Sequence, residues 1–138
     1  MNKSVAVVIL NWNGKDLLKK YLQNVVDNSK EAEVIVADNG SNDSSVKFLQ
    51  ENFPQVRLIL LDKNYGFTGG YNKALQEVKS DYYILLNSDV EVTKNWITPI
   101  ISCMESDEKI AICQPKLRSY TNKKECEYAG AAGGYIDY

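Results

Sequence analysis

The chain has 138 residues, of which 44% are hydrophobic and 25% are charged. This length favours a single domain, large enough to bury a core without disulfides or structural metal. The 16 basic and 18 acidic residues give a net charge of −2, which argues against a basic surface for nucleic acid. The chain contains no histidine, which excludes a histidine-based catalytic triad and histidine metal ligands.

Strand-like and helix-like patterns alternate along the chain. Short apolar runs rich in β-branched residues predict strands at 4–10, 33–37, 56–61, 82–86 and 109–117. Apolar residues at helical spacing predict helices between them, at 15–26, 44–53, 68–78 and 94–106. The alternation predicts an α/β fold with a mainly parallel sheet.

The cysteines indicate the compartment. Cys103, Cys113 and Cys126 are odd in number and match no zinc or redox spacing, so reduced thiols in a cytoplasmic protein are expected. The first apolar run is too short for a typical signal peptide, and no stretch approaches the length of a transmembrane helix. The alternative is a peripheral position at the inner membrane face, reached through a partner or a further segment.

A polar segment follows each of the first four predicted strands. These segments are NWNG at 11–14, DNGSND at 38–43, DKNYGFTGG at 62–70 and NSD at 87–89. Right-handed crossovers bring the carboxyl ends of parallel strands to one edge of the sheet, where open α/β sheets bind ligands. Ordinary turns are polar as well, so only the chemistry of each segment can distinguish a binding site from a turn.

Asp38 ends the second predicted strand. At that position a carboxylate can accept hydrogen bonds from a nucleobase or a ribose. The residues after it have simpler explanations, because Asn39-Gly40 is a strong turn signal and Asp43 can cap the next helix. The glycines of 62–70 fit either a loop with positive φ or close backbone approach to a phosphate.

Asn87 and Asp89 follow the fourth predicted strand two residues apart. Residues at that spacing on an extended chain project to the same side. Their oxygens can therefore hold one face of a hard divalent ion such as Mg²⁺ or Mn²⁺. A simple Asx turn explains the same residues and is the favoured interpretation of this segment taken alone.

In this order, the four segments resemble those of the family 2 glycosyltransferases, which have the GT-A fold. The matching stretches are VVILNWNG, VADNGSND, NYGFTGGYN and LLNSD, and the match covers almost the whole chain. The subgroup that the chain resembles most is the bacterial rhamnosyltransferase-like enzymes of polysaccharide synthesis, whose tail is similar to EYAGAAGGYID. The resemblance implies a GT-A three-layer sandwich, truncated at its C-terminal end.

The resemblance also implies roles for individual residues. Trp12 would pack on the nucleobase, and Asp38 would hydrogen-bond uracil or thymine. Asn87 and Asp89 would take the place of the family's D-x-D metal site and hold Mn²⁺ or Mg²⁺ against the diphosphate. The nucleotide-binding residues would be Leu10, Trp12, Asp38, Asn64, Gly66 and Ser88.

The implied activity is inverting glycosyl transfer from a UDP- or dTDP-sugar to a glycan or lipid-linked acceptor in cell-surface polysaccharide synthesis. The metal would neutralise charge on the leaving diphosphate, and a general base would take the acceptor's proton. In the family that base lies well downstream of the metal site, so it is expected beyond residue 138. Residues 1–118 would form the nucleotide-sugar-binding core, and 119–138 would begin an incomplete acceptor side.

The chain departs from the family pattern in one motif, since N-S-D has one carboxylate fewer than D-x-D. Such a substitution is compatible with the subgroup and does not indicate an inactive enzyme. Because the chain resembles only the donor-binding half, one alternative is a module that binds the nucleotide sugar without transferring it. Another is a sugar nucleotidyltransferase, although NWNGKD lacks the glycine-rich, arginine-bearing loop expected after its first strand. Apolar surface left exposed by a missing second half could also drive formation of a homodimer.

Overall fold

A computed structural model of the chain describes residues 3–128. The chain forms two compact units, the first ending at Ile97 and the second beginning at Thr98. The predicted boundary at residue 118 stays a prediction, and residues 129–138 of the predicted acceptor side lie outside the described residues. Between residues 3 and 128, no helix is both long and apolar enough to cross a bilayer. The elements are β1 (Val5–Asn11), α1 (Lys15–Asn28), β2 (Glu33–Asp38), α2 (Ser45–Asn52), β3 (Arg57–Leu60), α3 (Gly66–Gln76), β4 (Tyr82–Leu86), α4 (Ile97–Glu105), β5 (Leu117–Arg118) and β6 (Cys126–Tyr128).

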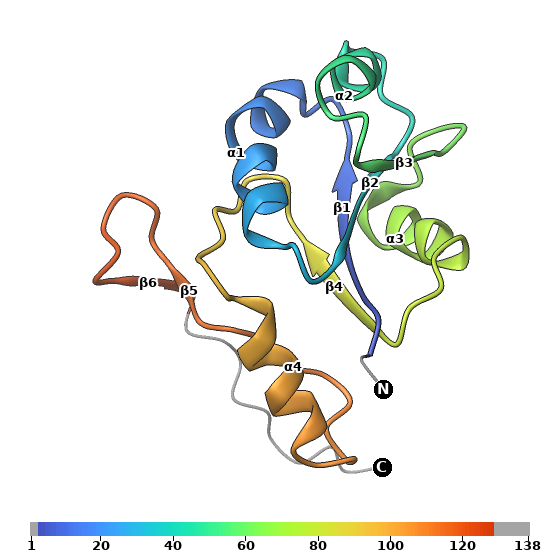
Figure 1. The fold of residues 1–138 in the computed structure, drawn as a ribbon. Helices are drawn as coiled ribbons and strands as arrows, with labels where there is room; N and C mark the ends of the chain where they lie inside the picture. The colour runs from blue at the N-terminus through green and yellow to red at the C-terminus, as the bar shows by residue number, and fades with distance from the viewer. Residues whose placement is uncertain (1–2, 129–138) are drawn as a thin grey trace. The chain divides into compact units, whose positions relative to one another are not determined.

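The first unit is built around a four-stranded parallel sheet in the order β3-β2-β1-β4. Helices α1 and α2 cover one face of this sheet, and α3 covers the other (Figure 1). Each crossover between parallel strands contains one helix, as short βαβ units require. The predicted α/β fold with a mainly parallel sheet is confirmed.

The core lies on both faces of β1, whose residues 5–9 are all buried. On one face, α1 buries Leu18, Leu22 and Val25, which follow helical spacing. On the other face, Tyr71 and Ala74 of α3 pack with small and β-branched strand residues. That cluster consists of Ala6, Val8, Ile35, Ala37, Ile59, Tyr71, Ala74 and Val78.

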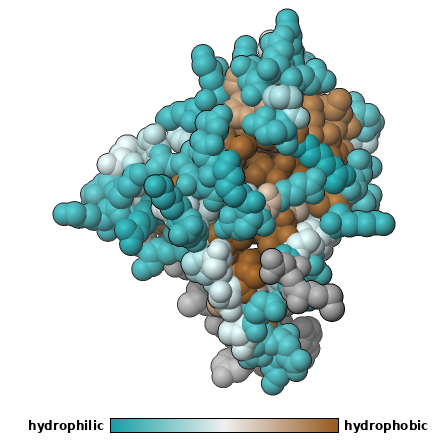
Figure 2. Space-filling model, viewed as in Figure 1, coloured by the Kyte–Doolittle hydropathy of each residue, from teal (hydrophilic) through white to brown (hydrophobic). Residues whose placement is uncertain are grey.

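Strand β4 differs from expectation because it is an edge strand. Leu85 is 52% exposed and Tyr83 is 43% exposed, although the run YYILL suggested a buried strand. Figure 2 shows apolar side chains reaching the surface between the polar helical layers. The run is apolar on both faces, but only the face toward α1 and α2 is covered at this edge.

The predicted fifth strand at 109–117 is wrong. Residues 110–116 form no regular structure, and β5 begins only at Leu117, where it pairs antiparallel with β6 in a separate two-stranded sheet. Pro115 has no backbone N–H and fixes φ, so it interrupts the apolar run that suggested a strand. Pro99 lies in the first turn of α4, where helices tolerate proline.

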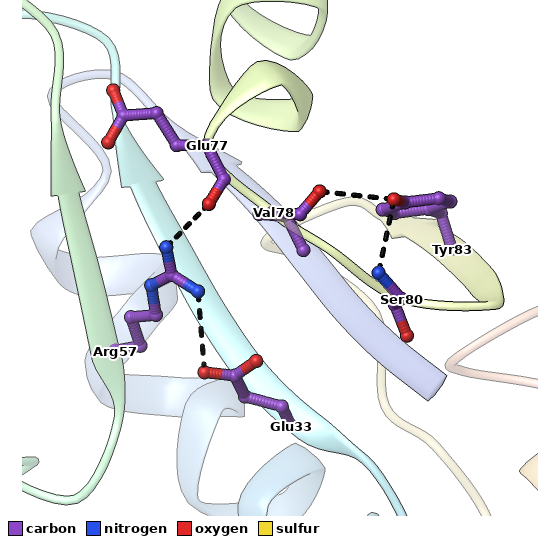
Figure 3. Close-up of polar contacts among 6 residues, drawn as sticks. All are labelled: Glu33, Arg57, Glu77, Val78, Ser80 and Tyr83. Carbon is purple, nitrogen blue, oxygen red and sulfur yellow. Dashed lines mark hydrogen bonds and ion pairs between the residues drawn. The ribbon is translucent and has the colours of Figure 1, made fainter. Parts of the chain in front are cut away.

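Side chains fasten the amino edge of the sheet (Figure 3). Arg57 at the start of β3 donates to the carbonyl of Glu77 at 2.6 Å and pairs with the carboxylate of Glu33 at 3.7 Å. The Tyr83 hydroxyl donates to the carbonyl of Val78 at 3.0 Å and accepts from the backbone N–H of Ser80 at 3.2 Å. These contacts fix the end of α3 and its connection to β4.

A second set of hydrogen bonds joins the residues that directly precede β1 and β4. The backbone N–H and hydroxyl of Ser4 both donate to Asp81 Oδ2, at 2.7 and 2.8 Å. Asp81 N–H donates back to the Ser4 hydroxyl at 2.9 Å. Because the register of parallel strands is set at their ends as well as by packing, this pair supports the alignment of β1 with β4.

The acid sensitivity of this fastening is predictable. Hydrogen bonds from the Ser4 backbone and hydroxyl hold the pKa of Asp81 below its ordinary value of 3.8. A lowered folded pKa gives stability that is complete above the unfolded pKa and is lost as pH falls through the folded one. We expect Asp81→Asn to reduce the pH dependence of the unfolding free energy below about pH 4. Urea unfolding at a series of acid pH values measures this dependence. If the unfolding free energy of Asp81→Asn changed with pH as that of wild type does, the lowered pKa of Asp81 would be contradicted.

Candidate functional site

The carboxyl ends of the four parallel strands lie side by side, as the sequence predicts. Asn11 at the end of β1 is in register with Asp38 at the end of β2, and Leu86 at the end of β4 is in register with Ile9. The ladder continues past the strands, because Asn39 N–H donates to the Asn11 carbonyl at 2.7 Å. The polar segments after β1, β2, β3 and β4 therefore share one edge of the sheet.

A buried polar network lies at the centre of this edge. Asp38 is 2% exposed, and both of its carboxylate oxygens accept hydrogen bonds. Oδ1 accepts from Asn11 Nδ2 at 2.9 Å, and Oδ2 accepts from the backbone N–H of Ser41 at 2.9 Å. Asn11 Nδ2 also donates to the Ser41 hydroxyl at 3.3 Å. Each Asp38 oxygen keeps further acceptor capacity beyond these bonds.

Asn11 is a site residue that the sequence did not predict. It is 1% exposed, and its amide fixes the orientation of the Asp38 carboxylate. Its Oδ1 atom is buried without a hydrogen-bond partner among the described residues, and a Cβ at Gly14 would lie 2.5 Å from it. An asparagine that directly follows an apolar strand, with a glycine three residues later, is the signal that could have indicated this role.

The β1–α1 and β2–α2 loops are tied together by Asn13. Its φ of 50° places it in the left-handed region, which asparagine tolerates better than most residues. Asn13 Oδ1 accepts from the N–H groups of Asn42 and Asp43, at 2.9 and 3.3 Å. Burial acts to raise the pKa of Asp43, but hydrogen bonds from Ser45 and the Lys15 backbone outweigh it and lower that pKa.

Asn39 ties the β2–α2 loop to the segment before α3. It is 2% exposed, and its Nδ2 donates to Asn64 Oδ1 at 3.0 Å and to the Gly66 carbonyl at 2.9 Å. Its Oδ1 accepts from Tyr65 N–H at 2.9 Å. Asn39 was predicted to be a turn residue, but the structure makes its side chain the support of the nearby loop. Gly70 of α3 packs close to it, since a Cβ there would lie 2.9 Å from Asn39 Nδ2.

The remaining predicted nucleotide-binding residues occupy different environments. The Trp12 side chain is 57% exposed beyond the end of β1. Leu10 is half-buried and turns toward α3, where a Cβ at Gly70 would lie 2.9 Å from its methyl groups. Asn64 and Gly66 are exposed, and Asn64 Oδ1 accepts from Gly66 N–H at 2.7 Å. Their roles in binding a nucleotide stay predictions.

The predicted metal ligands lie in the loop that follows β4. Asn87 and Asp89 are exposed and Ser88 is half-buried. No intramolecular hydrogen bond or ion pair with another described residue engages the side chains of Asn87 and Asp89. Within residues 3–128, no three Asp, Glu, Cys or His side chains are grouped closely enough to hold a metal ion. The assignment of Asn87 and Asp89 as metal ligands stays a prediction. Two oxygen donors are too few for a hard cation, so its other ligands would come from outside the described residues.

Similar proteins identify the family of the chain. Residues 6–131 match the family model described as glycosyl transferase family 2. The chain is 33% identical over 113 residues to the uncharacterized glycosyltransferase YfnE of Bacillus subtilis (strain 168). It is 28% identical over 103 residues to the teichoic acid poly(glycerol phosphate) polymerase of Staphylococcus epidermidis. These matches cover 78% and 71% of the chain but only 29% and 14% of the relatives.

Solved structures agree on the fold. A mannosyltransferase, PcManGT from Pyrobaculum calidifontis in complex with GDP-Man and Mn²⁺, superposes on 86% of the chain with a TM-score of 0.65 and 17% identity. S. aureus TarS 1–349 in complex with UDP superposes on 82% with a TM-score of 0.65 and 16% identity. The chain covers 34% and 38% of these two structures, so it spans only part of such enzymes. The α/β sheet is thus a GT-A fold, and the chain belongs to glycosyl transferase family 2.

Proposed function

We propose that the chain is the donor-binding part of an inverting glycosyltransferase that uses a UDP- or dTDP-sugar. One observation carries the proposal: the exposed Asn87 and Asp89 follow β4, which pairs with β1, the strand whose last residue Asn11 is hydrogen-bonded to Asp38. Family membership supports transfer chemistry, and this edge offers both a fixed acceptor group and free metal ligands. The rhamnosyltransferase-like subgroup remains part of the proposal.

The base site would combine Trp12 with Asp38. The exposed Trp12 ring offers a stacking surface, which nucleobases use without regard to sequence. Uracil and thymine present an N–H donor at N3, and a carboxylate oxygen with spare lone pairs is its complement. Asn11 and Ser41 hold the Asp38 carboxylate in one orientation. Binding of the base would therefore cost little side-chain entropy at Asp38.

The diphosphate would meet the chain at the loop after β4. Asn87 and Asp89 would hold Mn²⁺ or Mg²⁺, and diphosphate oxygens and water would complete its coordination. When bound, the ion supplies Lewis-acid stabilisation of the charge on the departing diphosphate. With a single carboxylate, the chain alone would bind metal weakly, so metal and nucleotide are expected to bind together.

The acceptor side is proposed to lie mainly outside this chain. Relatives include proteins named teichoic acid polymerase and undecaprenyl-phosphate 4-deoxy-4-formamido-L-arabinose transferase. We therefore propose a glycan or lipid-linked acceptor at the cytoplasmic face of the membrane, in cell-surface polymer synthesis. The general base would lie beyond residue 138. By itself the chain would bind the donor with little transfer.

Calorimetric titration of UDP and dTDP, each with Mn²⁺ and with EDTA, tests the proposal. We expect Mn²⁺ to tighten binding of both nucleotides by roughly tenfold and Asp89→Ala to abolish this effect. Loss of a residue that only supports a metal ligand already lowers metal affinity by about tenfold or more, and Asp89 would be a ligand itself. Asp16→Ala, which removes an exposed carboxylate from the first turn of α1, is the matched control and should keep the benefit. Binding of neither nucleotide, or equal loss in both variants, would refute the proposal.

A further inference from the structure

Tyr71 of α3 touches the strand end that carries the proposed metal ligands. Its side chain is 4% exposed, and its hydroxyl donates to the carbonyl of Leu86 at 3.1 Å. Leu86 is the last residue of β4 and directly precedes Asn87. Burial raises the pKa of the Tyr71 hydroxyl, with hydrogen bonding by the Leu10 backbone opposing it, so the group stays a donor at neutral pH.

The loop that follows is anchored at both of its ends. Pairing of β4 with β1 ends at Leu86, and no strand of the described sheet lies on the other side of β4. After the loop, the N–H of Val92 donates to Asn24 Oδ1 on α1 at 2.8 Å. The segment between Leu86 and Val92 is therefore held at one end by Tyr71 and at the other by Asn24.

Tyr71 also links this loop to the nucleotide side of the edge. Its ring packs edge-on against Phe67 in the first turn of α3, with centroids 5.1 Å apart. Gly70, the preceding residue, packs closely against Asn39, which supports the 64–66 loop. A single rigid helix thus contacts both halves of the proposed donor site.

We propose that Tyr71 is a positioning residue for the metal–diphosphate site, which acts by fixing the Leu86 carbonyl and hence the direction in which Asn87 and Asp89 leave the strand. The inference rests on the proposed function. Second-shell hydrogen bonds of this kind orient metal ligands, and their loss weakens metal binding although the ligands remain. Tyr71 itself touches neither substrate nor metal in this role.

Tyr71→Phe tests the inference, with Tyr83→Phe as the matched control. Tyr83 also donates its hydroxyl to a backbone carbonyl, but it lies at the amino end of the same strand, away from the loop. We expect Tyr71→Phe to remove most, but not all, of the roughly tenfold Mn²⁺-dependent tightening of UDP binding, while binding in EDTA stays unchanged. Tyr83→Phe should keep the full Mn²⁺ effect. The same Mn²⁺ effect in both variants would overturn the inference.

Amide hydrogen exchange gives a readout that needs neither metal nor nucleotide. Tyr71→Phe should speed exchange at residues 87–90 relative to wild type, whereas Tyr83→Phe should not. Unchanged exchange there would overturn the inference even if metal binding fell. If wild-type protein shows no Mn²⁺ effect at all, the proposed function fails and the inference falls with it. A wild-type effect that Tyr71→Phe leaves intact overturns only the inference.

Discussion

Gly40→Ala is expected to destabilise the chain by about 3 kcal/mol. Gly40 has a φ of +71°, and a Cβ there would lie 2.5 Å from the backbone of Lys63. The substitution therefore combines left-handed strain with a clash against main chain, which cannot rotate away as a side chain can. Urea unfolding monitored by tryptophan fluorescence measures the loss.

Gly66→Ala separates the two contributions. Gly66 has the same φ of +71°, but no atom lies within 4 Å of its would-be Cβ. Gly66→Ala should therefore lower the unfolding free energy only by the backbone strain, about 1 kcal/mol. Equal losses in the two variants would show that the packing of Gly40 against Lys63 does not contribute. That result would contradict the close approach of the β2–α2 and β3–α3 loops.

Asp38→Ala is expected to destabilise the chain by about 3 kcal/mol and to abolish UDP binding. The change removes one of the two acceptors of the buried Asn11 Nδ2 and the acceptor of the partly buried Ser41 N–H. A buried polar group left unsatisfied costs about 1–3 kcal/mol. Chemical unfolding measures the stability, and calorimetry below the midpoint of unfolding measures the binding.

Asp89→Ala is the contrasting variant. Asp89 is exposed and its side chain makes no hydrogen bond or ion pair with another described residue, so its removal should leave stability unchanged within about 0.5 kcal/mol. The two aspartates at the same sheet edge would thus have different roles. Asp38 would support the fold and the base site, and Asp89 would hold the metal. Loss of stability in Asp89→Ala, or wild-type stability in Asp38→Ala, would contradict this division.

Most of the sheet could be predicted because its strands are bounded by turn residues. The buried run of β1 and the helical spacing of Leu18, Leu22 and Val25 each allow a single reading. The common edge of the polar segments follows from parallel pairing alone. The apolar run before Pro115 led to the wrong prediction of a strand at 109–117. A strand needs a partner strand, and a local pattern does not show whether one is available.

The support of the site could not be read from the sequence. Asn11, Asn39 and Tyr71 each act through contacts with residues 15 to 27 positions away. Asn39 in an Asn-Gly pair is typical of a turn, and Tyr71 at a helical core position is typical of packing. Only the folded arrangement shows that Asn39 contacts the loop carrying Asn64, and that Tyr71 contacts the strand end before Asp89.

The central claim is that the carboxyl edge of the sheet binds a metal–nucleotide pair. Paramagnetic broadening of amide NMR signals by Mn²⁺, recorded with UDP present, tests it most directly. Broadening should be strongest at residues 87–89 and extend to 11–13, and Asp89→Ala should remove it. Signals at the amino edge, from Ser4, Arg57 and Tyr83, should stay sharp. Broadening centred on the amino edge, or none at 87–89, would contradict the claim.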